Sequence, residues 1–327
     1  MESAVNIPTE AKKPEKLPVV QTTNLGKFYR TGFWMNQKIE SLKSCTLKVY
    51  QGETFGLLGH NGAGKTTLLK TLLGIVRPTS GSGILLGQPI GDRVIKEKIG
   101  YLPENPYFYE YLTGWEFLEF VAGLFQIPIS IQKQRIRELL DLVGLSKSTA
   151  IRKQLRQYSK GMLQRVGMAQ ALINDPELVF LDEPMSGLDP MGRYQIREII
   201  ISLKKQGKTI FFNSHVLSDV EKICDRIAIL VEGELICIGT LDEVLGTNES
   251  YYVKGKSGNL KILKQWIPDL EFEHNFWQGH LRGDPKEFLV SLGLMKATLM
   301  KMNIERLSLE EYFMQQLREK GIFSSRE

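Results

Sequence analysis

The sequence predicts an α/β fold in which a parallel sheet is covered by helices on both faces. Short apolar runs such as ETFGLLG, ELVFLDE and TIFFNSH alternate with helical stretches such as KTTLLKTLLG and MGRYQIREIIISLKK. Strands that are apolar along their whole length are typical of a sheet buried on both faces, because a half-exposed strand would alternate polar and apolar residues. We therefore expect a doubly covered parallel sheet as the core of the chain.

Patterns along the 327 residues predict two domains. Residues 1–18 are rich in Lys, Glu and Pro, and we expect them to form a flexible tail. Strand signals disappear between about residues 107 and 174, where helical patterns predict a helical subdomain inserted into the main domain, residues 19–246. After the turn-rich GTNES, residues 247–327 mix strand and helix patterns, which predicts a small α+β C-terminal domain.

Composition excludes several classes of protein. The formal net charge of +5 comes from 42 basic and 37 acidic residues, so the chain lacks the one-sided excess of a dedicated nucleic-acid binder. The polar N-terminal segment does not resemble a signal peptide, and no apolar run approaches the ~20 residues needed to cross a bilayer. We expect a cytoplasmic chain whose cysteines, Cys45, Cys224 and Cys237, are buried and reduced.

A phosphate-binding loop is the strongest local signal. Residues 59–66, GHNGAGKT, match GxxxxGK[ST] between an apolar strand and a helix. The glycines let successive N–H groups face phosphate oxygens, and the helix adds its positive end. We expect Lys65 between the β- and γ-phosphates and the Thr66 hydroxyl on Mg²⁺, although an ordinary glycine-rich turn is the alternative. The predicted nucleotide-binding residues are Gly59, Asn61, Gly62, Ala63, Gly64, Lys65, Thr66 and Thr67.

Two acids end a second apolar strand, LVFLDE. Because ligands of open α/β sheets bind at the carboxyl ends of the strands, both acids are expected near the phosphate loop. Asp182 fits as a partner of Mg²⁺, and Glu183 fits as the group that orients and deprotonates an attacking water. The alternative is a helix cap, since Pro184 directly after Glu183 would permit a helix to start there.

With these motifs in order, residues 18–246 resemble the ABC ATPases, and the resemblance implies a P-loop NTPase with a RecA-like core and an antiparallel β subdomain. The segment YSKGMLQR stands where this family has its LSGGQ signature and keeps Ser159 and Gly161. A serine hydroxyl and a glycine N–H at a helix N-terminus can hold the γ-phosphate of a nucleotide bound to a second subunit, although a simple N-cap is the alternative. The segment departs from the signature at Tyr158, Lys160 and Met162.

The resemblance extends to three further positions of the site. Asp189, in SGLD, matches the loop that crosses the dimer interface, and His215 matches the histidine that touches the γ-phosphate, although a histidine at a strand end is commonly structural. Glu104 stands where most of the family has glutamine, a position that lends an oxygen to Mg²⁺ or its water. The catalytic set is thus predicted as Glu183, His215 and Lys65, and the metal set as Thr66, Glu104 and Asp182.

An aromatic residue near the start of the domain completes the resemblance. Tyr29 matches the ring that stacks on adenine, while Phe33 and Trp34 offer rival rings nearby. Any of these rings could instead serve only packing.

The resemblance implies an ATPase that needs ATP and Mg²⁺ and pairs with a second cassette, in a homodimer. The aromatic-rich segment 105–113 is expected to receive a separate membrane subunit, with core packing as the alternative. Together with the C-terminal extension, this segment favours the ABC-2 type exporters. A soluble ABC ATPase acting on nucleic acid is a second hypothesis, but its hallmarks, a long coiled coil or a second cassette, are missing. A cassette that binds ATP without hydrolysing it is the third.

Overall fold

The computed structural model describes residues 17–32, 36–246, 250–305 and 308–321. These residues form two compact units, and the second comprises the described residues from 240 onward. All but the last two residues of the predicted tail, 1–18, and both rival rings, Phe33 and Trp34, lie outside the described residues. Within the described ranges no helix is both long enough and apolar enough to span a bilayer.

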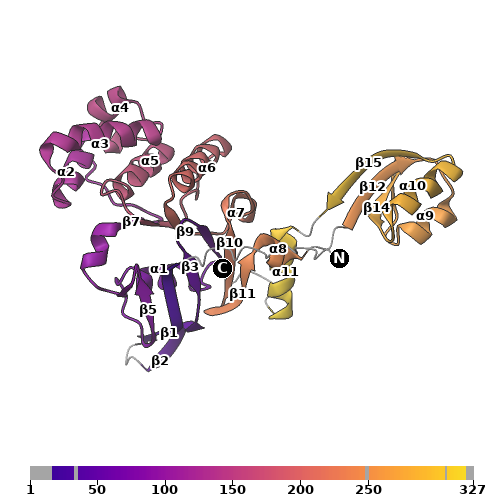
Figure 1. The fold of residues 1–327 in the computed structure, drawn as a ribbon, viewed down its shortest axis with the longest axis horizontal. Coiled ribbons are helices and arrows are strands. Elements are labelled where there is room, and N and C mark those ends of the chain that lie inside the picture. Colours follow the sequence, from indigo (N-terminus) through magenta and orange to yellow (C-terminus); the bar gives the residue numbers. More distant parts are fainter. Residues whose placement is uncertain (1–16, 33–35, 247–249, 306–307, 322–327) are drawn as a thin grey trace, which may run out of the picture. The chain divides into compact units, whose positions relative to one another are not determined.

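A six-stranded sheet forms the core of the first unit, in the order β11-β10-β4-β9-β8-β7 (Figure 1). The strands from β10 to β7 pair in parallel. Every residue of β4, β9 and β8 is buried, because helices cover the sheet on both sides. The strands are β4 (Thr54–Leu58), β7 (Ile99–Leu102), β8 (Leu178–Asp182), β9 (Thr209–Ser214), β10 (Arg226–Val231) and β11 (Glu234–Thr240).

An antiparallel sheet of five strands accompanies the parallel one, in the order β2-β1-β5-β6 with β3 also paired to β1. Its buried apolar side chains share one hydrophobic cluster with those of β4, β8 and β9. The two sheets therefore belong to one domain core. The strands are β1 (Pro18–Thr31), β2 (Gln37–Cys45), β3 (Lys48–Tyr50), β5 (Ser80–Leu85) and β6 (Gln88–Pro89).

Four helices between β7 and β8 form the helical insertion, which Figure 1 shows gathered beside the carboxyl end of β7. The first of them begins with a capping box, in which Thr113 accepts from the backbone of Glu116 and Glu116 accepts from that of Thr113. The helices are α2 (Gly114–Leu124), α3 (Ile129–Leu142), α4 (Lys147–Arg152) and α5 (Lys160–Ala171).

Three further helices follow the strands of the parallel sheet: α1 (Lys65–Leu72), α6 (Pro190–Lys205) and α7 (Leu217–Ile223). No helix starts at Pro184, so the alternative in which Asp182 and Glu183 cap a helix is wrong. Helix α6 instead begins six residues later, where the Asp189 side chain accepts from Gly192 N at 3.0 Å and Pro190 occupies the first turn. The two acids are left free to face the loop after β4.

Phe211 lies at the centre of the parallel sheet, fully buried, with its ring 5.4 Å from the rings of both Phe55 and Phe180. Replacing it with alanine should lower the free energy of unfolding by about 3–5 kcal/mol, because transfer and cavity costs add. Urea unfolding followed by circular dichroism measures this change, with the exposed Phe272→Ala as control. A loss under ~1 kcal/mol at Phe211 would contradict the packing described here.

The second unit carries a ferredoxin-like βαββαβ arrangement with an antiparallel sheet in the order β13-β14-β12-β15. Trp277, Phe288 and Val253 are buried in its core, so Trp277 serves packing. Its strands are β12 (Ser250–Lys256), β13 (Glu271–Glu273), β14 (Phe276–Leu281) and β15 (Thr298–Glu305). Its helices are α8 (Leu241–Leu245), α9 (Leu260–Trp266), α10 (Pro285–Leu294) and α11 (Leu309–Glu319).

The cysteines follow the prediction in two of three cases. Cys45 and Cys224 are buried, and burial raises the pKa of the Cys45 thiol to about 12. Cys237 differs, because it lies on β11 at the edge of the sheet and is only partly buried. Cys45 and Cys224 are free thiols.

Candidate nucleotide-binding and hydrolysis site

The loop between β4 and α1 has a backbone that only glycine fits. Gly64 has a φ of +107°, and a Cβ there would lie 2.4 Å from the carbonyl oxygen of Ser41. At Gly59 a Cβ would lie equally close, 2.4 Å, to the carbonyl oxygen of Leu230. Helix α1 starts directly after this loop and has no side-chain cap, so its first N–H groups remain available to an anion.

A cavity of about 600 Å³ opens over this loop, large enough for a nucleotide phosphate chain. Its lining comes from the loop and α1, from β2, and from the segments that follow β7, β8 and β9. The position agrees with the general rule that open α/β sheets bind ligands at the carboxyl ends of their strands. The lining residues are Ser41, His60, Asn61, Gly62, Ala63, Gly64, Lys65, Thr66, Thr67, Glu104, Glu183, Ser186 and His215.

Lys65 is buried in the floor of this cavity and is held by the loop itself. Its Nζ donates to the carbonyl oxygens of Gly59, at 2.7 Å, and His60, at 3.2 Å. Burial lowers the pKa of the ammonium group, and the carboxylates of Glu183, Asp182 and Glu104 act against this shift. The ammonium group therefore stands among carbonyls and carboxylates, where phosphate oxygens can replace the carbonyls as its partners.

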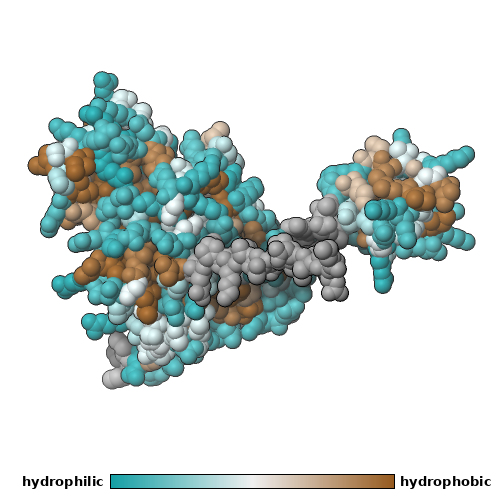
Figure 2. Space-filling model, viewed as in Figure 1, coloured by the Kyte–Doolittle hydropathy of each residue, from teal (hydrophilic) through white to brown (hydrophobic). Residues whose placement is uncertain are grey.

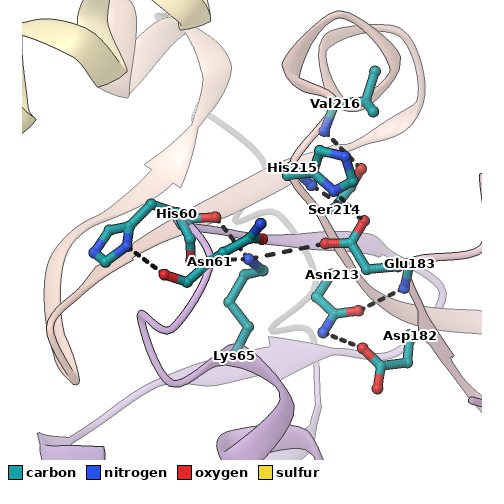
Figure 3. Close-up of polar contacts among 10 residues, drawn as sticks. His60, Asn61, Lys65, Asp182, Glu183, Asn213, Ser214, His215 and Val216 are labelled. Carbon is teal, nitrogen blue, oxygen red and sulfur yellow. Dashed lines mark hydrogen bonds and ion pairs between the residues drawn. The ribbon is translucent and has the colours of Figure 1, made fainter. Parts of the chain in front are cut away.

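Glu183 lies between Lys65 and His215 (Figure 3). Its Oε1 is 3.9 Å from Lys65 Nζ, and its Oε2 is 2.8 Å from His215 Nδ1 and accepts from His215 N at 3.3 Å. Burial raises the pKa of this carboxyl, while the neighbouring His215 and Lys65 lower it. A buried carboxylate with a raised pKa, aimed into a phosphate-sized cavity, is suited to accept a proton from water.

Asp182 supplies the carboxylate that a metal bound to the nucleotide would need. Asn213 Nδ2 donates to its Oδ1 at 2.6 Å, and Oδ2 has no hydrogen-bond partner among the described residues. Burial raises the pKa of Asp182, and the Asn213 hydrogen bond opposes this. Within the described chain no three His, Cys, Asp or Glu side chains form a metal cage. This donor set suits Mg²⁺, which takes one or two carboxylates plus phosphate oxygens and waters.

Six predicted residues do not line the cavity: Tyr29, Gly59, Ser159, Gly161, Asp182 and Asp189. Ser159 caps α5 by accepting from Met162 N at 3.3 Å, so the N-cap role proposed as an alternative exists in this chain. Asp189 caps α6, and Tyr29 is partly exposed on β1 with Lys27 Nζ 5.0 Å from its ring centre. The other predicted nucleotide residues line the cavity, and Gly59 contributes through its carbonyl oxygen, which accepts from Lys65.

Four residues of the site were missed in the sequence, and one of them, His60, lines the cavity from within the phosphate loop. Ser41 lies on β2 and donates to Thr67 Oγ1 at 2.9 Å, and Ser186 lines the cavity just after the acidic strand. Asn213 is fully buried on β9 beside both acids. Ser186 and Asn213 stand next to recognised motifs, which was a usable signal, whereas Ser41 lies in a segment with no motif.

Comparisons with known proteins agree with this geometry. The family model for the ABC transporter domain matches residues 42–186. An uncharacterised ABC transporter ATP-binding protein of Nostoc sp. is 68% identical over 300 residues, which cover 91% of this chain and 90% of that protein. The bacitracin transport ATP-binding protein BcrA of Enterococcus faecalis is 39% identical over 236 residues, 71% of this chain and 73% of that protein.

Solved structures show the same fold. An ATP-binding cassette in a dimeric post-hydrolysis state with ADP and Pi has a TM-score of 0.62 and 26% identity over 68% of this chain and 98% of its own. The cassette cbiO1 of Clostridium perfringens, part of an ABC transporter complex, has a TM-score of 0.61 and 28% identity over 70% of this chain and 91% of its own. These matches confirm the predicted P-loop NTPase fold. The chain belongs to the ABC transporter ATP-binding proteins and is an ATP-hydrolysing cassette.

Proposed function

We propose that this chain binds ATP with Mg²⁺ in the cavity over α1 and drives export through a separate ABC-2 type membrane subunit. The observation that carries the catalytic part is the Glu183 carboxylate, held between Lys65 and His215 at the mouth of the phosphate loop. In this assignment Lys65 stabilises the β- and γ-phosphates, Glu183 orients and deprotonates water, and His215 contacts the γ-phosphate. Tyr29 stacks on the adenine.

Three residues are assigned to the metal. Thr66 and Glu104 line the cavity, and Asp182 offers the oxygen that Asn213 leaves free. When bound, Mg²⁺ supplies charge neutralisation on the phosphates. Glu104 is exposed and offers a carboxyl group where glutamine is usual, so the metal meets an acidic side chain in place of a neutral amide at this position.

A second copy of the chain completes the site in this proposal. Ser159, Gly161 and Asp189 do not line the cavity of their own chain. Ser159 and Gly161 lie at the start of α5, where N–H groups and a hydroxyl suit a γ-phosphate held by another subunit. A homodimer closing head to tail on two ATP molecules brings these residues to the nucleotide.

The surface proposed for the membrane subunit lies on the helical insertion. Tyr107, Tyr109 and Tyr111 are exposed, whereas Phe108 between them is buried against Phe117 at a ring distance of 5.1 Å. Figure 2 shows hydrophobic surface over this part of the first unit. Apolar side chains exposed together in this way are typical of a binding surface for another protein. The neighbouring exposed residues are Phe120, Leu124, Phe125, Ile129 and Ile131.

Truncating two of these rings should uncouple the motor from its partner. The double variant Tyr107→Ala, Tyr111→Ala should keep the ATP turnover of the isolated chain and lose about tenfold or more in affinity for the co-purifying membrane protein, because interface aromatics commonly contribute over ~1 kcal/mol each. Turnover with and without the reconstituted partner measures this, with the exposed Tyr194→Ala as control. Unchanged partner affinity in the double variant would reject this surface.

The remaining assignments follow from the transport role. The chain acts at the inner face of the cell membrane through its partner, and residues 247–327 form an accessory domain. No nucleic acid is expected as a partner. Nucleic-acid binding that weakens steeply with salt would instead support the soluble, non-transport class.

A further inference from the structure

Asn213 joins the two acids of the site through a single side chain (Figure 3). It lies on β9 directly opposite Asp182 of β8 in the parallel pairing and is completely buried. Its Nδ2 donates to Asp182 Oδ1 at 2.6 Å, and its Oδ1 accepts from the backbone N–H of Glu183 at 3.0 Å. Both ends of the amide are therefore occupied by the two residues assigned to the metal and to the attacking water.

The chemistry of the partners fixes the orientation of this amide. A carboxylate oxygen can only accept and a backbone N–H can only donate, so the NH₂ group must face Asp182 and the oxygen must face Glu183. Asparagine is therefore matched to this place, because an aspartate offers no donor and a leucine of similar shape offers neither group.

The backbone of Glu183 needs this support. Its φ is +49°, in the left-handed region that a non-glycine residue rarely occupies without being held there by its surroundings. Both the side-chain oxygen and the main-chain oxygen of Asn213 accept from Glu183 N, at 3.0 Å and 3.2 Å. This turn directs the Glu183 side chain toward Lys65 and His215.

We propose that Asn213 is a positioning residue for hydrolysis. It occupies Oδ1 of Asp182, which leaves Oδ2 as the oxygen for Mg²⁺, and it holds the turn that places the Glu183 carboxylate. The inference rests on the proposed roles of Asp182 and Glu183. The new element is that the buried Asn213 amide on β9 sets the geometry of both Asp182 and Glu183.

Two substitutions separate the two halves of this role. Asn213→Asp keeps an acceptor for Glu183 N but removes the donor to Asp182 and places a second carboxylate against it. Asn213→Leu removes both side-chain hydrogen bonds while nearly keeping the shape of the side chain. The matched control is Thr209→Val, which sits on the same strand and is equally buried, and whose Oγ1 accepts from Gly52 N at 3.0 Å at the opposite end of the strand.

The first measurement is nucleotide affinity of the full-length chain by calorimetry, with EDTA and with Mg²⁺. Both Asn213 variants should bind Mg²⁺-free ATP as the wild type does. The increase in ATP affinity on adding Mg²⁺ should be smaller than in the wild type by about tenfold or more, because the hydrogen bond to the charged Asp182 carboxylate is lost. The second measurement is turnover at saturating Mg²⁺-ATP, where kcat should fall by about tenfold or more and Asn213→Leu should fall furthest. Thr209→Val should change neither quantity beyond about twofold.

The outcomes distinguish the possible failures. The inference would be overturned if both Asn213 variants kept the wild-type kcat and the wild-type increase in ATP affinity on adding Mg²⁺, and showed only a lowered melting temperature. The proposed function would remain intact in that case. A wild type without any Mg²⁺ gain and without Glu183-dependent turnover would overturn both. If Asn213→Leu does not fold, Asn213→Ser serves in its place, and the same two readings decide.

Discussion

A glutamine at position 183 is expected to lower ATP turnover by about a hundredfold to ten-thousandfold, the usual contribution of a positioned general base. Glutamine keeps the size of the side chain and can still contact His215, but it cannot take a proton from water. The buried carboxylate, whose pKa is raised by burial, is suited to that step. Phosphate release by the purified chain, alone and with its membrane partner, measures the loss.

A matched control lies at the other end of the same segment. Glu177 precedes β8, is half exposed, and forms an ion pair with Lys98 at 2.9 Å. Glu177→Gln should leave turnover unchanged, because a surface ion pair contributes little. Nucleotide binding should survive in Glu183→Gln, since the phosphate loop is intact. Equal turnover of the wild type and Glu183→Gln would instead indicate a nucleotide-sensing module.

Removal of the Lys65 ammonium group should have the second large effect, on binding of the nucleotide itself. In Lys65→Ala the affinity for ATP should fall by at least about tenfold, because hydrogen bonds to a charged group contribute about 1.5–3 kcal/mol each and 1.4 kcal/mol is tenfold. Turnover should fall as well, since the ammonium group that stabilises charge on the transferred phosphoryl group is lost. Calorimetry with ATP and phosphate release measure the two losses.

The control for Lys65 is a lysine of equal charge away from the cavity. Lys48 is exposed on β3 and does not line the cavity, so Lys48→Ala should bind ATP as the wild type does. A melting curve without nucleotide shows whether Lys65→Ala is folded. ATP affinity within twofold of wild type in a folded Lys65→Ala variant would exclude the phosphate role of this lysine.

Much of the site is local in sequence and was therefore predictable. The glycines, Lys65 and Thr66 belong to one continuous loop, so their spacing alone encodes the backbone path and the helix start that a phosphate requires. Glu183 at the end of β8 and His215 at the end of β9 line one cavity, as expected, because parallel strands share their carboxyl ends at one edge of the sheet.

Asn213 shows which part of the site could not be predicted from local sequence patterns. It stands 31 residues from Asp182, and its meaning depends on β8 and β9 being neighbours with those two residues in register. Ser41 on β2 likewise contacts Thr67 on α1, which is far from it in the sequence. The competing helix start at Pro184 was also decided by the tertiary structure, in which Asp189 caps α6 instead.

The sequence by itself determined the doubly covered parallel sheet, the phosphate loop, the acidic strand and the resemblance to the ABC ATPases, because each is written in contiguous residues whose periodicity or spacing follows local backbone geometry. Only the tertiary structure decided which side chains from separate strands meet, namely that Glu183 lies between Lys65 and His215 and that Asn213 joins the two acids. The physical reason is that strand order and register arise from packing of the whole core, which no short segment contains.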